Sequence, residues 1–134
     1  MLLKVTDHYR ISDIQDKFNE CFPFLKLEFY HTAHDWKEGS PAAECIHESE
    51  KIGHIRTVHN PEILDIKSWH RTGDVEQLFR QKLGLNVQIF RLDGNRWLQS
   101  TESDVLTLRQ QSDMAQASQQ KQKPELPEYD EIFQ

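Results

Sequence analysis

The chain has 134 residues, of which 22 are acidic and 16 are basic, so that its net charge is −6. A protein that binds nucleic acid mainly through phosphate contacts needs a basic surface, and this charge disfavours that class of function. The length suffices for one hydrophobic core without a metal or a disulfide framework, and no apolar run is long enough to span a bilayer. We therefore expect a cytoplasmic protein without a membrane segment.

The first part of the chain predicts a strand, a helix and a second strand. Residues 2–6 alternate between apolar and polar side chains, as a short strand does, and apolar residues then recur at helical spacing from Ile14 to Phe22. Pro23 ends this helix, because its ring fixes φ and it has no N–H to donate. Residues 25–29 alternate again, which predicts the second strand.

Residues 62–100 repeat the order of residues 1–30. Ser12-Asp13-Ile14-Gln15 corresponds to Gly73-Asp74-Val75-Glu76, and a similar apolar spacing follows each of the two segments. Gly84 stands where the first unit has its proline, and there we expect a left-handed residue that ends the second helix. The sequence thus contains an internal repeat of a strand–helix–strand unit.

A duplicated strand–helix–strand unit predicts an α+β fold. The most economical closure is a ferredoxin-like split sheet with both helices on one face, and two hairpin-like halves that share a core are the alternative. Residues 93–95 read Asp-Gly-Asn, a strong signal for a hairpin because its tight turn needs a positive φ. We therefore expect an extra C-terminal strand at residues 96–99.

The remaining segments are not duplicated in the sequence. Residues 31–61 form an insert between the repeats, within which residues 52–58 fit either a short helix or an edge strand. A polar helix is predicted at residues 104–120, after a single α+β domain that spans residues 1–103. The acidic residues 121–134 contain two prolines and predict a disordered tail.

Several stretches of the chain resemble a family of small uncharacterised bacterial proteins of the Bacteroidetes type. The stretches that carry the resemblance are Gly84–Arg91, Gly94–Leu98, Thr107–Gln111, Phe22–Phe29 and Gly39–Pro41. The resemblance covers about residues 1–112. It implies an intracellular bacterial protein, and because the family has no established activity, it implies no catalytic residue.

A zinc site in the segment 31–47 is one alternative function. The donors would be His31, His34, Cys45 and His47. Their side chains are of the types that zinc prefers, but a His-x₂-His pair with a Cys-x-His pair matches none of the usual ligand spacings. A polar surface loop is the favoured interpretation, and we expect neither a metal nor another cofactor.

Binding of single-stranded nucleic acid through a sheet face is a second alternative. Tyr30 and Phe90 occupy corresponding outward positions on the second strand of each repeat, with Arg91 and Arg96 nearby. Aromatic rings on a sheet, with basic groups beside them, can stack on unpaired bases. The acidic balance of the chain argues against this function, and nucleic acid is not the expected partner.

The function that the sequence favours is a protein-interaction or assembly module. No nucleophile with a base and an orienting acid is evident, and the five glycines form no phosphate-binding loop, so we expect no enzymatic activity. Trp36 and Trp69 fall beside loops, where tryptophans anchor contacts, whereas Trp97 is expected in the core. Tyr129 and Phe133 lie among acidic residues of the tail and are further candidates for contact with a partner protein or with a second copy of the chain.

Overall fold

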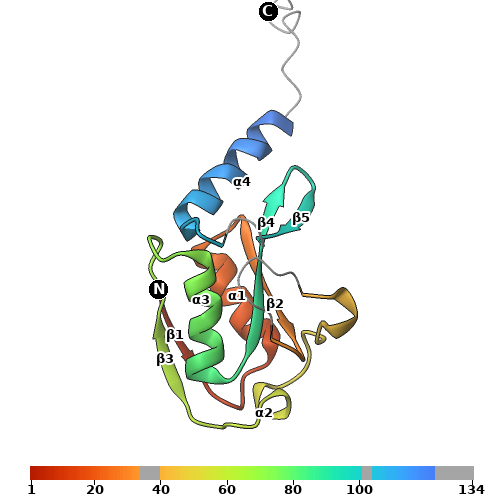
Figure 1. The fold of residues 1–134 in the computed structure, drawn as a ribbon, viewed down its shortest axis with the longest axis vertical. Coiled ribbons are helices and arrows are strands. Elements are labelled where there is room, and N and C mark those ends of the chain that lie inside the picture. Colours follow the sequence, from red (N-terminus) through yellow and green to blue (C-terminus); the bar gives the residue numbers. More distant parts are fainter. Residues whose placement is uncertain (34–39, 101–103, 123–134) are drawn as a thin grey trace, which may run out of the picture.

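The computed structural model describes residues 1–33, 40–100 and 104–122 (Figure 1). Its elements, in chain order, are β1 (Leu2–Val5), α1 (Ile11–Cys21), β2 (Leu25–Tyr30), the 3-10 turn η1 (Ala42–Glu44), α2 (Ile52–Ile55), β3 (Glu62–Asp65), α3 (Thr72–Leu78), the π-helical turn η2 (Phe79–Leu83), β4 (Asn86–Asp93), β5 (Arg96–Gln99) and α4 (Leu108–Gln122). The fold is therefore α+β, as predicted.

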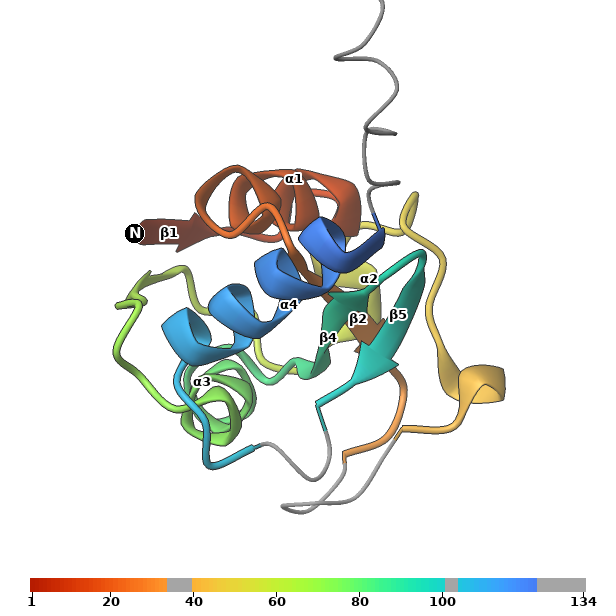
Figure 2. The same cartoon turned by 90° about the horizontal axis from the view of Figure 1, so that it is seen from above.

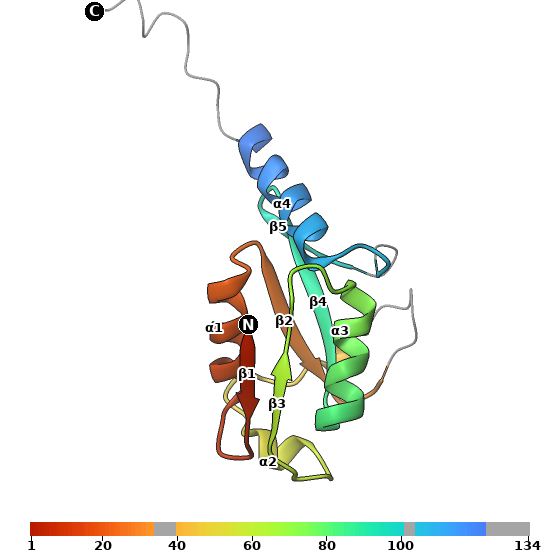
Figure 3. The same ribbon diagram turned by 90° about the vertical axis from the view of Figure 1, so that its left-hand side faces the viewer.

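The strands form two small antiparallel sheets, one with the order β1-β3 and the other with the order β2-β4-β5. The ferredoxin-like split sheet is not confirmed, because such a sheet would hold the strands of both units in one layer. Alternation along a strand determines which face is buried but leaves its neighbour open, and this is why the sequence did not predict the pairing. In Figure 3, α1 lies on the side of β1 and α3 lies on the side of β3.

Each sheet pairs residues that occupy corresponding positions of the two sequence units. Leu3 lies opposite Leu64 in the first sheet, and Glu28 lies opposite Gln88 in the second. Both pairings are antiparallel, and each joins one strand of residues 1–30 to one strand of residues 62–100.

The backbone hydrogen bonds at the starts of α1 and α3 also correspond. The N–H of Ile11 donates to the carbonyl of Glu50 at 2.9 Å, and the N–H of Thr72 donates to the carbonyl of Leu106 at 2.8 Å. A stretch of the expected insert 31–61 thus accepts backbone hydrogen bonds from the start of α1, just as residues 104–107 accept them from the start of α3. Because residues 104–107 contact the start of α3, they do not belong to the following helix. Helix α4 therefore begins at Leu108, four residues later than predicted.

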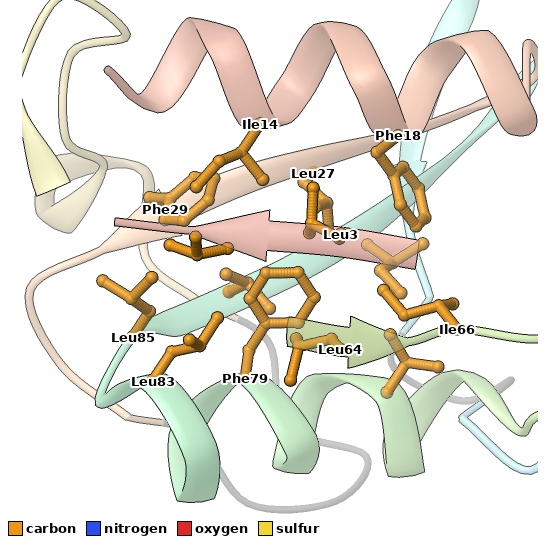
Figure 4. Packing of buried hydrophobic residues seen from close by; sticks show 14 of the residues in the cluster. Leu3, Ile14, Phe18, Leu27, Phe29, Leu64, Ile66, Phe79, Leu83 and Leu85 are labelled. Atoms are coloured by element: carbon orange, nitrogen blue, oxygen red, sulfur yellow. The ribbon is translucent and has the colours of Figure 1, made fainter. Parts of the chain in front are cut away.

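The hydrophobic core lies between the two sheets and the helices α1 and α3 (Figure 4). Phe29 of β2 and Phe79 of η2 meet at its centre with ring centroids 6.4 Å apart, nearly edge to face. Phe18 of α1 is also fully buried, whereas Cys21, which belongs to the predicted apolar stripe, is exposed. Phe22 takes the buried position at that end of the helix.

Two glycines have the left-handed backbone that the sequence predicts. Gly84 has φ of 66° and follows η2, and Gly94 has φ of 62° in the turn between β4 and β5. The expected extra strand is present as β5. Residues 52–55, for which the sequence left a helix and an edge strand open, form the short helix α2. Figure 2, seen from above, places α4 beside β4. Within the described residues, no helix has both the length and the apolar character needed to cross a membrane.

Candidate functional site

In the part of the chain that the structure describes, strand β3 has one free edge, because its only neighbour in the sheet is β1. Met1 and Ile66 exchange two backbone hydrogen bonds, of 2.9 and 2.8 Å. Since hydrogen-bonded and non-hydrogen-bonded pairs alternate along antiparallel strands, Leu64 bonds to β1 while Ile63 and Asp65 turn their N–H and C=O groups to the free edge. Among the described residues, no hydrogen bond occupies these outward groups.

The free edge of β3 and one face of α3 enclose a groove of about 360 Å³. Its apolar lining consists of Ile63, Leu64, Val75 and Leu78, and its polar lining consists of Asp65, His70, Asp74 and Lys82. The residues from α3 are spaced so that they lie on one side of the helix. A strand edge and a helix therefore flank an apolar floor, with charged groups at the rim.

Large apolar side chains are exposed around this groove. Ile63 is 60% exposed on the outer face of β3, and Trp69 is 68% exposed in the turn between β3 and α3. The indole of Trp69 contacts the ring of His70, with centroids 4.4 Å apart, and His70 lines the groove. This arrangement places Trp69, one of the predicted contact residues, at the end of the groove.

The charges at the rim are not uniform along the groove. Asp65 and Asp74 lie toward the start of α3, where Asp74 is in the first helical turn, while Lys82 lies toward the other end. Lys67 forms an exposed ion pair with Asp65 at 3.3 Å, which contributes little because water screens it. The groove is thus acidic near Trp69 and basic at its far end.

The alternative zinc site gains no support from the described residues, which contain no group of three or more potential ligands. Burial, and then the neighbouring Glu28 carboxylate at 3.5 Å, raise the pKa of the Cys45 thiol, whereas zinc requires the thiolate. His47 has its Nδ1 engaged with the Ser49 hydroxyl at 2.8 Å. His34, the fourth predicted ligand, lies outside the described residues.

Tyr30 is only 4% exposed and offers no ring surface for stacking. The segment around Cys45 forms a β-bridge with it. Burial is the main cause that raises the pKa of the Tyr30 hydroxyl far above its ordinary value, with smaller effects from nearby Cys45 and Glu28. Of the two aromatic residues predicted to face outward on the corresponding strands, Tyr30 is therefore excluded as a stacking surface, and Phe90 remains.

The basic groups near Phe90 are engaged with other residues. Lys26 lies over the rings of Phe90 and Trp97, with its Nζ 5.3 and 4.8 Å from the two centroids. Arg91 donates to Gln111 of α4 at 2.8 Å. Arg96 lies 3.9 Å from the carboxylate of Asp93. Trp97, which was expected in the core, is partly exposed, because β5 is an edge strand.

A group of buried polar side chains in the second unit was missed by the sequence analysis. Its members are Thr72, Glu76, Gln88, Ser100, Asp104 and Gln111. The signal that could have found them is the mismatch between the units, since Thr72 stands at the position of Ile11. A polar residue at a core position of one copy indicates a local polar network rather than an outward face.

Three of the predicted contact residues, Trp36, Tyr129 and Phe133, lie outside the described residues. Comparisons with protein-family models, with curated proteins and with solved structures give no match to this chain. The groove, the free strand edge and the buried polar group are the features of the structure that bear on function.

Proposed function

We propose that the protein is a non-catalytic interaction module that binds an extended segment of a partner protein as an added strand on β3. The observation that supports this most directly is the free edge of β3 beside an apolar groove. Strand addition supplies affinity through main-chain hydrogen bonds, and pockets for alternate side chains supply specificity. Ile63 and Asp65 would provide the main-chain groups.

The chemistry of the partner follows from the lining of the groove. Side chains of an added strand alternate between two faces, so that every second one meets the apolar floor at Leu64, Val75 and Leu78. The intervening residues lie near the carboxylates of Asp65 and Asp74, which favour basic side chains in the partner. The expected ligand is an extended segment in which apolar and basic residues alternate, with an aromatic or apolar contact to Trp69.

A free strand edge is a liability that proteins usually blunt with charges, prolines or cover. The edge of β1 is the internal comparison, because it lies on the corresponding element of the other unit. There Lys4 stands at the position of Asp65, so the two edges differ in charge. A ligand with basic residues would therefore select β3 over β1.

The test uses a phage-displayed library of random decapeptides, selected on the full chain. Selected peptides, synthesised and titrated, should alternate apolar with basic residues and should protect the amides of Ile63 and Asp65 from hydrogen exchange. The variant Ile63→Pro removes an outward donor that β1 does not use, so its fold should persist. Loss of one such bond, about 1 kcal/mol, and the clash of the proline ring should weaken binding about fivefold or more.

The matched control is Leu2→Pro, which removes the corresponding outward donor from β1. This variant should bind the selected peptides as tightly as the unmodified chain does. Equal weakening by the two prolines, or unchanged binding by Ile63→Pro with its fold intact by circular dichroism, would refute strand addition on β3. Failure of the library to yield any binder would also count against the proposed function.

A further inference from the structure

Two carboxyl groups contact each other in the interior of the second unit. Glu76 of α3 is 5% exposed and Asp104 is 1% exposed, and Asp104 lies close enough to Glu76 for its charge and a side-chain hydrogen bond to raise the pKa of Glu76. Glu76 Oε2 also accepts the backbone N–H of Ile89 at 2.7 Å and the side-chain amide of Gln88 at 3.1 Å. A hydrogen bond between two carboxyl groups needs a proton on one of them, because two carboxylates have only acceptors.

The surroundings of the pair favour the protonated form. Burial is the main cause that raises the pKa of Glu76 well above its ordinary value, although the N–H of Ile89 opposes it, and the charge and hydrogen bond of Asp104 add to the rise. From β2, Tyr30 lies close enough for Glu76 to affect its titration. Arg91 of β4 donates to Gln111 of α4.

The first unit has the same backbone arrangement without an acid pair. Gln15 stands at the position of Glu76, and its amide donates to the carbonyl of Leu27 at 2.8 Å. Glu48 stands at the position of Asp104 and is exposed. The N–H of Ser12 donates to the carbonyl of Glu48 at 3.0 Å, as that of Gly73 donates to the carbonyl of Asp104 at 2.9 Å. The backbone contacts thus do not require the acids.

We propose that one proton shared by Glu76 and Asp104 is a latch that holds residues 104–107 on the start of α3, and that its loss to solvent releases them. The segment 104–107 is fixed there by the amides of Thr72 and Gly73, and the N–H of Leu108, the first residue of α4, donates to the carbonyl of His70 at 3.0 Å. Release would therefore free the start of α4 together with the segment.

The direction of the pH dependence follows from linkage. The pair binds its proton more tightly when latched than when released, so the latch is strongest at low pH and weakens as pH rises toward the pKa of the latched pair. In that range each opening releases one proton, and the opening equilibrium increases about tenfold per pH unit. Higher pH thus favours the released form.

Amide hydrogen exchange on the full chain tests the latch, with the first unit as an internal reference. The amides of Thr72, Gly73 and Leu108 report on the second unit, and the amides of Ile11, Ser12 and Ile52 make the corresponding hydrogen bonds in the first unit. As pH rises above the ordinary range of a carboxyl group, protection in the second unit, corrected for intrinsic exchange, should fall relative to the first, by up to about tenfold per pH unit until the latched pair has lost its proton.

The double variant Glu76→Gln with Asp104→Asn keeps an N–H···O bond between the two side chains but holds no titratable proton. Its ratio of protection between the units should not change with pH. The variant Glu48→Gln removes the exposed acid at the corresponding position of the first unit and should behave as the unmodified chain does. A ratio that is independent of pH in the unmodified chain, or one with the same slope in the double variant, overturns the latch; the first outcome needs no variant to fold.

Discussion

The variant Arg56→Met should destabilise the protein more than any exposed charge does. Arg56 is buried at the end of η2, where its Nη1 donates to the carbonyl of Leu83 at 3.0 Å and its Nε donates to Asp7 at 2.8 Å. The carbonyl of Leu83 is one of the last in the helix, and a cation there also interacts favourably with the helix dipole. Methionine retains the apolar stem and removes only the guanidinium.

The magnitude follows from what the substitution leaves behind. A hydrogen bond to a charged group contributes about 1.5–3 kcal/mol, and a buried carbonyl left without a partner costs about 1–3 kcal/mol. Asp7 is partly exposed and regains water in the variant, which reduces the loss on its side. We expect Arg56→Met to lower the free energy of unfolding by about 2–4 kcal/mol.

Urea unfolding followed by circular dichroism measures this change. With a slope of about 2 kcal/mol per molar urea for a small domain, the midpoint should fall by about 1–2 M. The control is His59→Gln, which removes the other, half-exposed partner of Asp7 and should change stability by less than about 1 kcal/mol. Equal losses for Arg56→Met and His59→Gln, or a midpoint unchanged by Arg56→Met, would contradict the role assigned to the buried guanidinium.

Further predictions concern acid stability, the core and a helix end. Burial disfavours the charge of Asp7, but Arg56 and His59 outweigh it and lower its pKa from 3.8. The contribution of the Asp7 carboxylate to the free energy of unfolding is therefore lost only below that pH. Acid unfolding of Arg56→Met should show this contribution lost at higher pH. Phe79→Ala should cost about 3–5 kcal/mol in urea unfolding, because its fully buried ring leaves a cavity. Gly84→Ala should lower stability in the same assay by about 1 kcal/mol. The cause is backbone strain at its positive φ, and a methyl group there meets open space, so that no steric clash adds to the loss.

Local elements with a strong chemical signal could be predicted from the sequence. Pro23 ends α1 because its ring fixes φ and it has no N–H to donate, and Gly84 ends η2 because the missing Cβ allows a left-handed backbone. The Asp-Gly-Asn turn gave the β4–β5 hairpin for the same reason. Trp69, which is predicted to contact a partner because it falls beside a loop, is exposed, and its contact with a partner stays a prediction.

Long-range features could not be predicted, because they depend on contacts between units. The alternation in residues 2–6 and 63–67 is equally compatible with several neighbours, so the pairing of β1 with β3 was not found. In the sequence, Glu76 and Gln88 occupy positions typical of exposed polar residues on a helix and a strand, yet both are buried. Buried polar side chains need hydrogen-bonding partners, and Gln88 finds them in Glu76 and Ser100, which lie 12 residues before it and 12 residues after it in the chain.

The groove and the latch occupy different sides of one helix, α3. Asp74 and Val75 line the groove, whereas Glu76 holds the latch and Thr72 anchors the segment 104–107. Because the first turn of α3 serves both, release of the segment loosens the end of the groove where Asp74 lies. The two proposals therefore predict a coupling between protonation and peptide binding.

The selected peptides should bind more weakly as pH rises, and the double variant Glu76→Gln with Asp104→Asn should remove this dependence. Coupling free energies between sites in one protein are commonly about 1–3 kcal/mol, so the Kd should rise about fivefold or more between pH 6 and pH 8. By reciprocity, a bound peptide should raise the pKa of the acid pair by the same free energy, which hydrogen exchange of Gly73 can report. Equal pH dependence of the Kd in the double variant would show that the groove and the latch act independently.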